Sequence, residues 1–189
     1  MHVCYACVLI FEAASSNYHF FSCTNRAFGD VNFDVIFGPA YKGIPLGAIV
    51  SSALYSQYGV NVDFTYNRKE VKDHGEGGQL VGASMANKRV LIIDDVITAG
   101  TAIRESYDLL TSVQAIPMGV VIALDRAEIR SKDDPQSAVQ AVERDLSIPV
   151  VSIITLVELQ HFLEEQSSDI YDASTLLSVI DYRKEYGAL

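Results

Sequence analysis

Cysteine is scarce in this chain of 189 residues, and the few cysteines all stand near its start. They are Cys4, Cys7 and Cys23. An odd number without a disulfide framework indicates a reducing compartment, so we expect a cytoplasmic protein. Cys4 and Cys7 have the spacing of a redox pair or of half a zinc site. No second CxxC pair and no paired histidines follow, so we predict neither a redox pair nor a zinc site here.

Positive charge and long apolar runs are also in short supply. The chain has 14 lysines and arginines against 24 acidic residues, a formal net charge of −10. This balance argues against broad binding to nucleic acid or to anionic membranes, although a local basic cluster could still hold a small anion. The apolar run from Val3 to Phe11 is too short to cross a bilayer. As a secretory leader, the other possibility, it lacks a preceding lysine or arginine.

From residue 33 onward, β-branched runs alternate with amphipathic segments. This rhythm predicts an α/β fold, in which a mainly parallel sheet is flanked by helices. The expected strands cover residues 33–37, 60–66, 89–93, 118–124 and 150–154, and the expected helices cover 44–58, 102–111, 136–146, 172–186 and a segment beginning at 155. Residues 1–32 do not join the rhythm. We therefore expect an atypical N-terminal segment, 1–32, followed by one domain, 33–189.

The most informative motif is VLIIDDVITAGTA at positions 90–102. An apolar strand ends in Asp94 and Asp95, and a loop of small residues then opens a helix. Ligands of such sheets sit beyond the carboxyl ends of the strands, and the backbone N–H groups of this loop could hold a phosphate. Thr98 and Thr101 add hydroxyl donors, while the two carboxylates could accept hydrogen bonds from a ribose or hold hydrated Mg²⁺. The alternative, an acidic pair that merely caps the helix, does not explain the complete pattern.

This motif resembles the phosphoribosyl pyrophosphate-binding motif of type I phosphoribosyltransferases. Two further stretches, FGPAYKGIP at 37–45 and NRKEVKDHGEGG at 67–78, are similar to the orotate phosphoribosyltransferases and unlike their purine-using relatives. Asp125-Arg126 and SIITL at 152–156 fit the same family. The resemblance implies the type I fold with a flexible basic lid loop. It also implies Mg²⁺-dependent transfer of ribose 5-phosphate to orotate, giving orotidine 5′-monophosphate and pyrophosphate in pyrimidine biosynthesis.

The resemblance also assigns residues. Catalysis falls to Lys72, Asp94 and Asp95, and orotate binding to Thr98 and Arg126. The contacts to phosphoribosyl pyrophosphate fall to Tyr41, Lys42, Arg68, Lys69, Lys72, His74, Asp94, Asp95, Val96, Ile97, Thr98, Ala99, Gly100, Thr101 and Ala102.

Two of these residues, taken alone, could have a purely structural role instead. Lys42 could be a surface lysine after a Gly-Pro turn, and Arg126 could form a surface salt bridge with Glu128. For Mg²⁺, the resemblance implies that the substrate holds it, with water-mediated contact to Asp94 or Asp95. The lid implies a homodimer, in which Arg68, Lys72 and His74 would reach the neighbouring subunit's site and Lys69 would serve its own.

The family pattern is broken before Phe33. Family members carry a lysine-bearing stretch and a Ser-Pro-Tyr-Phe-Phe strand there, whereas this chain has only Tyr18-His19-Phe20-Phe21. Three alternatives follow. One is a non-catalytic regulator that binds phosphoribosyl pyrophosphate, and another is a form whose activity is impaired because the orotate-contacting segment is missing. The third, a purine phosphoribosyltransferase, is disfavoured by the lid and by the FGPAYKG stretch.

Overall fold

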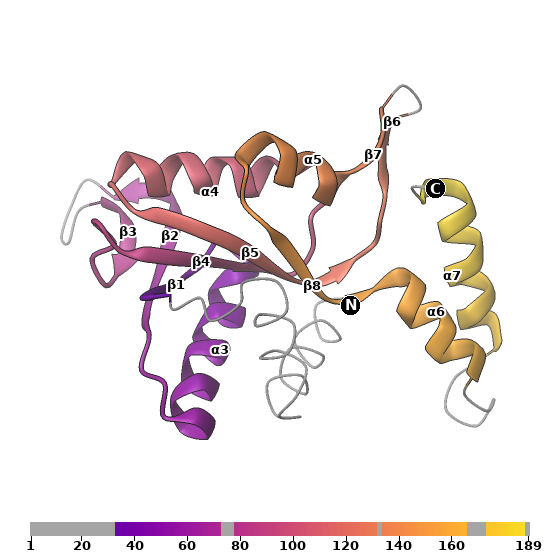
Figure 1. Cartoon of the computed structure of the whole chain (residues 1–189), viewed down its shortest axis with the longest axis horizontal. Coiled ribbons are helices and arrows are strands. Elements are labelled where there is room, and N and C mark those ends of the chain that lie inside the picture. Colours follow the sequence, from indigo (N-terminus) through magenta and orange to yellow (C-terminus); the bar gives the residue numbers. More distant parts are fainter. Residues whose placement is uncertain (1–32, 73–77, 132–133, 166–172, 188–189) are drawn as a thin grey trace.

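The computed structural model describes residues 33–72, 78–131, 134–165 and 173–187 (Figure 1). The expectations for the cysteines, for 18–21 and for His74 lie outside these residues. Eight strands are described: β1 (Val35–Gly38), β2 (Asp63–Lys72), β3 (Gly78–Gly82), β4 (Arg89–Asp94), β5 (Ile116–Asp125), β6 (Ile129–Ser131), β7 (Asp134–Ser137) and β8 (Val150–Thr155). The helices are α3 (Gly43–Tyr58), α4 (Thr101–Ser112), α5 (Ala138–Leu146), α6 (Leu156–Glu165) and α7 (Ala173–Tyr186).

Six of these strands form one sheet in the order β3-β2-β1-β4-β5-β8. Every neighbouring pair is parallel except β2 and β3, which are antiparallel. Figure 1 shows α3 on one face of this sheet and α4 with α5 on the other, while α6 and α7 extend beyond β8. The predicted α/β fold, a mainly parallel sheet with flanking helices, is therefore confirmed.

Alternation along the central strands produces two cores. In β4, Leu91 and Ile93 pack with α3, whereas Val90 and Ile92 pack in the cluster that α4 and α5 share. All four side chains are at most 1% exposed. Burial on both faces explains why this strand reads as a continuous apolar run, and each such side chain contributes roughly 1.5–3 kcal/mol through burial. Covered on both sides, the central strands form a rigid platform for the loops at their carboxyl ends.

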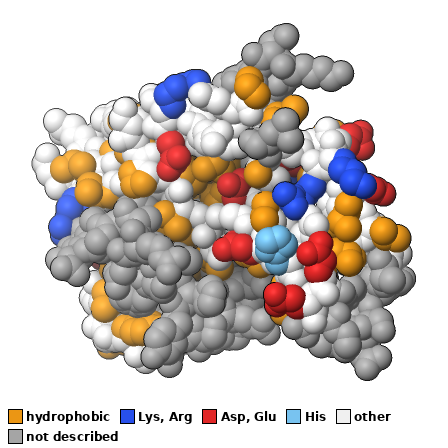
Figure 2. Space-filling model, turned by 45° about the vertical axis from the view of Figure 1, so that its right-hand side comes forward, with side chains coloured by type: hydrophobic (Ala, Val, Ile, Leu, Met, Phe, Trp, Pro, Cys, Tyr) orange, Lys and Arg blue, Asp and Glu red, His pale blue; other side chains and the backbone are white. Residues whose placement is uncertain are grey.

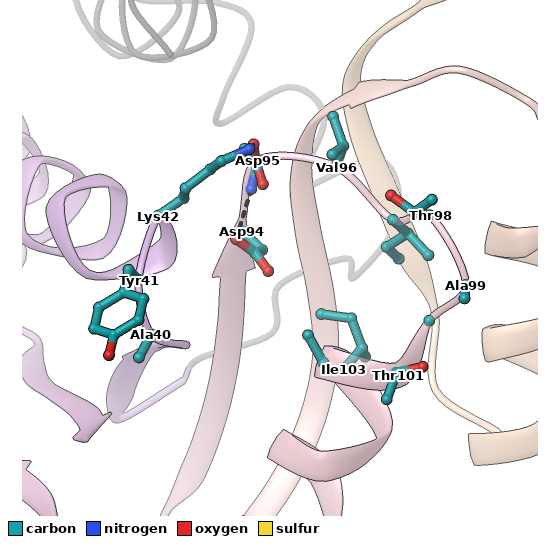
Figure 3. A pocket seen from close by; sticks show the side chains of 13 residues that line it. Ala40, Tyr41, Lys42, Asp94, Asp95, Val96, Thr98, Ala99, Thr101 and Ile103 are labelled. Atoms are coloured by element: carbon teal, nitrogen blue, oxygen red, sulfur yellow. Dashed lines mark hydrogen bonds and ion pairs between the residues drawn. The ribbon is translucent and has the colours of Figure 1, made fainter. Parts of the chain in front are cut away.

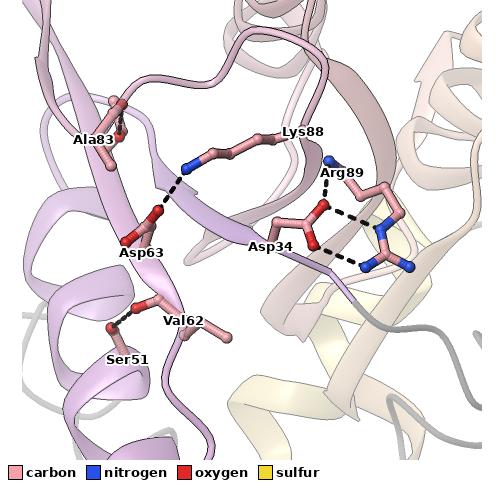
Figure 4. A network of polar contacts seen from close by, with 8 residues as sticks. Asp34, Ser51, Val62, Asp63, Ala83, Lys88 and Arg89 are labelled. Carbon is pink, nitrogen blue, oxygen red and sulfur yellow. Dashed lines mark hydrogen bonds and ion pairs between the residues drawn. The ribbon is translucent and has the colours of Figure 1, made fainter.

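The amino-terminal ends of β1 and β4 are joined by a bidentate ion pair between Asp34 and Arg89 (Figure 4). Asp34 Oδ1 accepts a hydrogen bond from Arg89 Nη2 at 2.8 Å, and Asp34 Oδ2 accepts from Arg89 Nε at 3.0 Å and from the Arg89 backbone N–H at 2.8 Å. These hydrogen bonds lower the pKa of the Asp34 carboxyl to about 2. The pair thus fixes the register of the two strands at the end remote from the carboxylate motif.

The basic stretch at 67–78 differs from its expected form. We expected a loop from Asn67, but β2 continues to Lys72 and pairs with β3, with Lys72 opposite Gly78. The pairing satisfies backbone groups that an isolated extended segment would leave open, which outweighs the weak strand propensity of its charged residues. The described part of the lid is therefore a β-hairpin arm, with a register shift between Asn67 and Lys72.

The second half of the domain follows the sequence pattern with one addition. The helix expected from 155 begins with a capping box, since Glu158 N donates to Thr155 Oγ1 and Thr155 N donates to Glu158 Oε2. The helix expected from 136 begins at Ala138, because residues 134–137 pair with β6 as a small antiparallel ribbon. Among the helices that the structure describes, none has both the length and the apolar character that a bilayer crossing demands.

Candidate active site

A pocket of about 370 Å³ opens at the carboxyl ends of β1 and β4 (Figure 3). Its walls are two loops, each of which leads from one of these strands into a helix. The lining residues are Ala40, Tyr41, Lys42, Asp94, Asp95, Val96, Ile97, Thr98, Ala99, Gly100, Thr101, Ala102 and Ile103. The structure thus brings Tyr41 and Lys42 together with the whole acidic motif, across a gap of more than fifty residues in the sequence.

Tight packing of two glycines sets the course of the β1–α3 loop. A Cβ at Gly38 would lie 2.3 Å from the carbonyl oxygen of Gly43, and a Cβ at Gly43 would lie 2.7 Å from that of Ile93 in β4. Neither position accepts a side chain, so the loop can approach the end of β4 closely. Asn67 of β2 secures it from the other side, because Asn67 Oδ1 accepts a hydrogen bond from the Ala40 N–H at 2.8 Å.

The two carboxylates differ in environment. Asp94 is 8% exposed, and burial, together with the neighbouring Asp95 charge, raises the pKa of its carboxyl from 3.8 to about 7. Its Oδ1 accepts a hydrogen bond from the Asp95 N–H at 2.9 Å, which partly offsets that rise. Asp95 Oδ2 lies 2.6 Å from Lys42 Nζ, and its backbone carbonyl accepts hydrogen bonds from Ala123 and Leu124 of β5. The pocket therefore holds one buried carboxyl and one lysine-paired carboxylate.

The helix α4 begins at this pocket with an open N-terminus. Its N-cap, Gly100, has φ 76° and supplies no side-chain cap. A Cβ there would lie 2.6 Å from both Arg104 Nη1 and Val142 Cγ2, so backbone conformation and space both require glycine. Thr98, Ala99 and Thr101 beside it are exposed. An uncapped helix N-terminus with exposed small residues suits a phosphate group.

Arg104 braces this loop from behind. Its Nη1 donates to the Ala99 carbonyl at 2.8 Å, and its Nη2 donates to Asp145 of α5 at 2.7 Å. Sequence reasoning missed Arg104 and Asn67 as residues that shape the site. Their side chains work through backbone groups of other loops, and only Asn67 fell within a stretch that the sequence had singled out.

Arg126, at the end of β5, lies beside Thr98. Its Nη2 donates to Thr98 Oγ1 at 2.9 Å, which joins the two residues that the resemblance assigned to orotate. The alternative ion pair also exists, since Arg126 Nη1 is 3.0 Å from Glu128 Oε1. The two arrangements are compatible because they occupy different nitrogens of the guanidinium group.

The lid residues are only partly described. Lys69 Nζ lies 5.1 Å from the centre of the Tyr41 ring, a cation–π distance at the rim of the pocket. Arg68 is half-buried in β2 and does not line the pocket. The backbone of Lys72 belongs to β2, and His74 lies outside the described residues. The structure therefore links Lys69 to the pocket, while the predicted roles of the other three stay predictions.

Within the described ranges, no three or more His, Cys, Asp or Glu side chains gather as a metal-binding cluster. The donors that face the pocket are Asp94 and Asp95, and Lys42 already neutralises the second of them. Mg²⁺ usually takes one or two protein carboxylates and completes its shell with water and substrate phosphates. The donor set fits a magnesium ion carried largely by a phosphorylated ligand.

The strand-end carboxylates, the open helix N-terminus and the fold define a phosphoribosyltransferase domain, and residues 17–151 match the family model of that description. The match starts at residue 17, whereas we had expected the domain to start at residue 33. The chain is 54% identical over 157 residues to orotate phosphoribosyltransferase of Thiobacillus denitrificans, covering 83% of this chain and 71% of that protein. It is 46% identical over 163 residues to orotate phosphoribosyltransferase 2 of Saccharomyces cerevisiae, covering 84% and 70%. The chain belongs to the orotate phosphoribosyltransferase family.

A solved structure agrees with this assignment. Orotate phosphoribosyltransferase from Francisella tularensis aligns with a TM-score of 0.70 and 34% sequence identity, covering 98% of this chain and 80% of the other. The predicted type I phosphoribosyltransferase fold and the family named from the sequence motifs are confirmed by these relatives.

Proposed function

We propose that this chain transfers ribose 5-phosphate from 5-phosphoribosyl 1-pyrophosphate to orotate, releasing pyrophosphate and forming orotidine 5′-monophosphate. The observation that carries the proposal is that one pocket joins Lys42, the Asp94–Asp95 pair and the open end of α4, and that Arg126 donates a hydrogen bond to Thr98 in its lining. About half of the 157 aligned residues are identical to those of orotate phosphoribosyltransferases. A non-catalytic sensor would not need the base-directed arginine.

The loop from Val96 to Ala102 is the anchor for the 5-phosphate. Backbone N–H groups at the start of α4 and the hydroxyls of Thr98 and Thr101 supply donors, and the helix dipole adds a favourable field. Arg104 holds this loop against α5 before any ligand arrives. Binding energy from the phosphate, which does not react, is then available to orient C1 of the ribose.

Asp94 and Asp95 face the ribose and its pyrophosphate. In their ionised forms they accept hydrogen bonds from the ribose hydroxyls, and their negative charge stabilises the positive charge that develops at C1. Mg²⁺ is the cofactor we propose; Asp94 or Asp95 would help to hold it through water, together with the bound substrate. When bound, it neutralises charge on the departing pyrophosphate.

Lys42 and Lys69 approach the pyrophosphate end. Lys42 comes from the β1–α3 loop, and Lys69 lies over the ring of Tyr41. We propose that Arg68, Lys72 and His74, all from the basic stretch at 67–78, act at the site of a second subunit, so the working unit is a homodimer. Closure of the arm excludes water and so limits hydrolysis of the activated sugar.

Arg126 and Thr98 face the base. The planar guanidinium group can hold the orotate carboxylate or a ring carbonyl in a bidentate fashion, which a lysine could not do. Orotate attacks C1 through its ring nitrogen as the bond from C1 to the pyrophosphate oxygen breaks, and the bonding electron pair leaves with pyrophosphate. The ring nitrogen gives up its proton, which the departing pyrophosphate or solvent water accepts. No protein nucleophile is required, so the chain contributes positioning and charge stabilisation.

We further propose that the enzyme works in the cytoplasm on small-molecule substrates, with no nucleic-acid or membrane partner. On the face in Figure 2, the described lysine and arginine side chains are scattered among acidic ones and form no extended basic surface. The net charge of −10 is unfavourable for polyanionic surfaces, whereas a small anion feels the local charge of Lys42 and Lys69.

The test replaces Asp94 and Asp95 together by asparagine. Loss of charge-assisted contacts should weaken Mg²⁺-dependent binding of phosphoribosyl pyrophosphate at least about tenfold, and orotate turnover should fall further. Calorimetric titration and an orotate assay measure the two effects. Asp108→Asn, an exposed position on α4, is the control and should behave as the wild type. Unchanged affinity and turnover in the double variant would remove this pocket from the reaction.

A further inference from the structure

The guanidinium group of Arg126 is held by residues from three separate parts of the chain. Thr98 comes from the loop between β4 and α4, Glu128 follows β5, and Tyr182 belongs to α7. Arg126 Nη2 donates to Thr98 Oγ1 at 2.9 Å, and Arg126 Nη1 lies 3.0 Å from Glu128 Oε1 and 3.3 Å from Tyr182 Oη. Helix α7 therefore contacts Arg126, the hydrogen-bond partner of Thr98 in the pocket lining, through one phenol group.

Tyr182 links the two charged residues as well as contacting one of them. Its hydroxyl donates to Glu128 Oε1 and accepts from Arg126 Nη1. Burial and the hydrogen bond to Glu128 raise the pKa of the Tyr182 hydroxyl, so it remains a phenol with a proton to donate at neutral pH. The three side chains form a closed triangle in which each contacts the other two.

The helix that carries Tyr182 is itself fixed in place. Glu128 forms an antiparallel bridge with Gly187 just after α7, and Arg183 donates to Gln160 of α6. The Tyr182 ring lies against the Tyr186 ring with 5.0 Å between centres. These contacts explain how a helix remote in sequence can hold a side chain at the pocket edge.

The triangle does not use the Nε–Nη2 edge of Arg126. Glu128 and Tyr182 both engage Nη1, whereas Nη2 points to Thr98 and the buried Nε has no hydrogen-bond partner among the described residues. The Nε–Nη2 edge is one of the two forks with which arginine takes a carboxylate in bidentate fashion. Without its Nη1 partners, a side chain with four rotatable bonds would spread over many orientations.

We propose that Tyr182, acting with Glu128, is a positioning residue for orotate: it holds Arg126 so that the Nε–Nη2 edge faces Thr98 and the base. The inference rests on the proposed function, in which Arg126 and Thr98 contact orotate. It makes α7 part of the base-binding site, although no residue of α7 lines the pocket.

The first experiment replaces Tyr182 by phenylalanine, which removes one hydroxyl and keeps the ring. KM for orotate should rise about three- to tenfold, the effect of one intramolecular hydrogen bond, while KM for phosphoribosyl pyrophosphate and kcat stay within about twofold. Tyr186→Phe is the matched control, because it removes a hydroxyl from the same helix, on a ring that packs against Tyr182, and that hydroxyl makes no hydrogen bond to Arg126. It should leave all three constants unchanged. Thermal unfolding checks that both variants are folded.

The second experiment repeats Tyr182→Phe in an Arg126→Ala background. If Tyr182 acts through Arg126, the second substitution should raise KM for orotate no further. An equal rise in both backgrounds, or no rise in the single variant, would overturn the positioning role. If Arg126→Ala itself leaves KM for orotate unchanged, the proposed contact between Arg126 and orotate is wrong, which is a separate failure.

Discussion

Lys42 Nζ lies 2.6 Å from Asp95 Oδ2, although the two residues stand 53 positions apart in the sequence. The contact ties the loop after β1 to the loop after β4 and spans the mouth of the pocket. The Lys42 side chain is 53% exposed and the Asp95 side chain 15% exposed, so the lysine is accessible to an incoming anion. A pyrophosphate that takes Lys42 would free Asp95 to accept hydrogen bonds from the ribose.

Replacing Lys42 by alanine should weaken phosphoribosyl pyrophosphate binding by about ten- to a hundredfold, the effect of one charge-assisted contact. Isothermal calorimetry with Mg²⁺ measures the affinity. Lys88→Ala is the matched control, because Lys88 Nζ also lies 2.6 Å from an aspartate, Asp63, but outside the pocket lining (Figure 4). An equal loss in both variants would mean that Lys42 acts only through the stability of the protein.

Affinity for phosphoribosyl pyrophosphate should rise with pH. The pKa of Asp94 is raised to about 7, and the ribose hydroxyls need the ionised form as acceptor. Below pH 7 binding must therefore release a proton, and affinity should fall by up to about tenfold per pH unit. Calorimetry in buffers of different ionisation enthalpy counts the protons. Asp94→Asn should lose this dependence, and a wild-type protein without proton release between pH 6 and 7 would contradict the role.

The same shift makes a prediction for stability. Because the folded protein holds a proton on Asp94 that the unfolded chain has lost, burial of this carboxyl costs stability progressively as pH rises from 3.8 to about 7. Asp94→Asn should therefore be at least as stable as the wild type at pH 8, while it binds the sugar pyrophosphate less well. Urea unfolding at pH 5 and pH 8 measures the difference. An Asp94→Asn variant that is clearly less stable than the wild type at pH 8 would show that the ionised Asp94 carboxylate does not destabilise the fold.

Gly100→Ala should impair ligand binding beyond its effect on stability. Alanine at φ 76° is strained by roughly 1–2 kcal/mol, and its Cβ would also collide with Val142 at 2.6 Å, which displaces the start of α4. Gly59→Ala separates the two effects, since Gly59 has φ 68° with no atom within 4 Å of a new Cβ. Both variants should lose stability, but only Gly100→Ala should lose phosphate affinity, measured with ribose 5-phosphate. Equal affinities would contradict the anchoring role of this loop.

The lid prediction concerns two chains. Under the proposed lid role, in which the arm engages pyrophosphate mainly as it leaves, Lys72→Ala should lower kcat more than it weakens ground-state binding. If Lys72 acts across a dimer, mixing this variant with Lys42→Ala should restore activity, since one of the two sites in a mixed dimer carries neither substitution. A mixture no more active than its parents, after proven subunit exchange, would refute the shared site.

The sequence was sufficient for the central features of the fold. Strand β4 could be identified because burial on both faces gives an unbroken apolar run, and its Asp94–Asp95 end predicted a site at the carboxyl edge of the sheet. The start of β2 overlaps the strand expected at 60–66, but its continuation to Lys72 and its pairing with β3 could not be predicted, because those charged and glycine-rich residues have loop propensity. They become strands through pairing between the two segments.

The contact between Arg126 and Tyr182 could not be predicted from the sequence, for a related reason. Glu128 lies two positions away and was recognised as a possible ion-pair partner. Tyr182 lies 56 residues after Arg126, in a helix with no motif. Only the folded arrangement of α6 and α7 brings it to Arg126. Residues that act on a site through another side chain leave little local signal in the sequence. The loop at Gly100, whose backbone N–H groups are proposed to bind phosphate, is recognisable from its run of small residues.

The most direct test of the whole account is a product analysis of the purified chain with orotate, phosphoribosyl pyrophosphate and Mg²⁺. We expect orotate to disappear with equal amounts of orotidine 5′-monophosphate and pyrophosphate formed. The reaction should require the sugar pyrophosphate, and adenine or hypoxanthine should not replace orotate. Tight binding of phosphoribosyl pyrophosphate without consumption of orotate, or transfer to a purine, would contradict it.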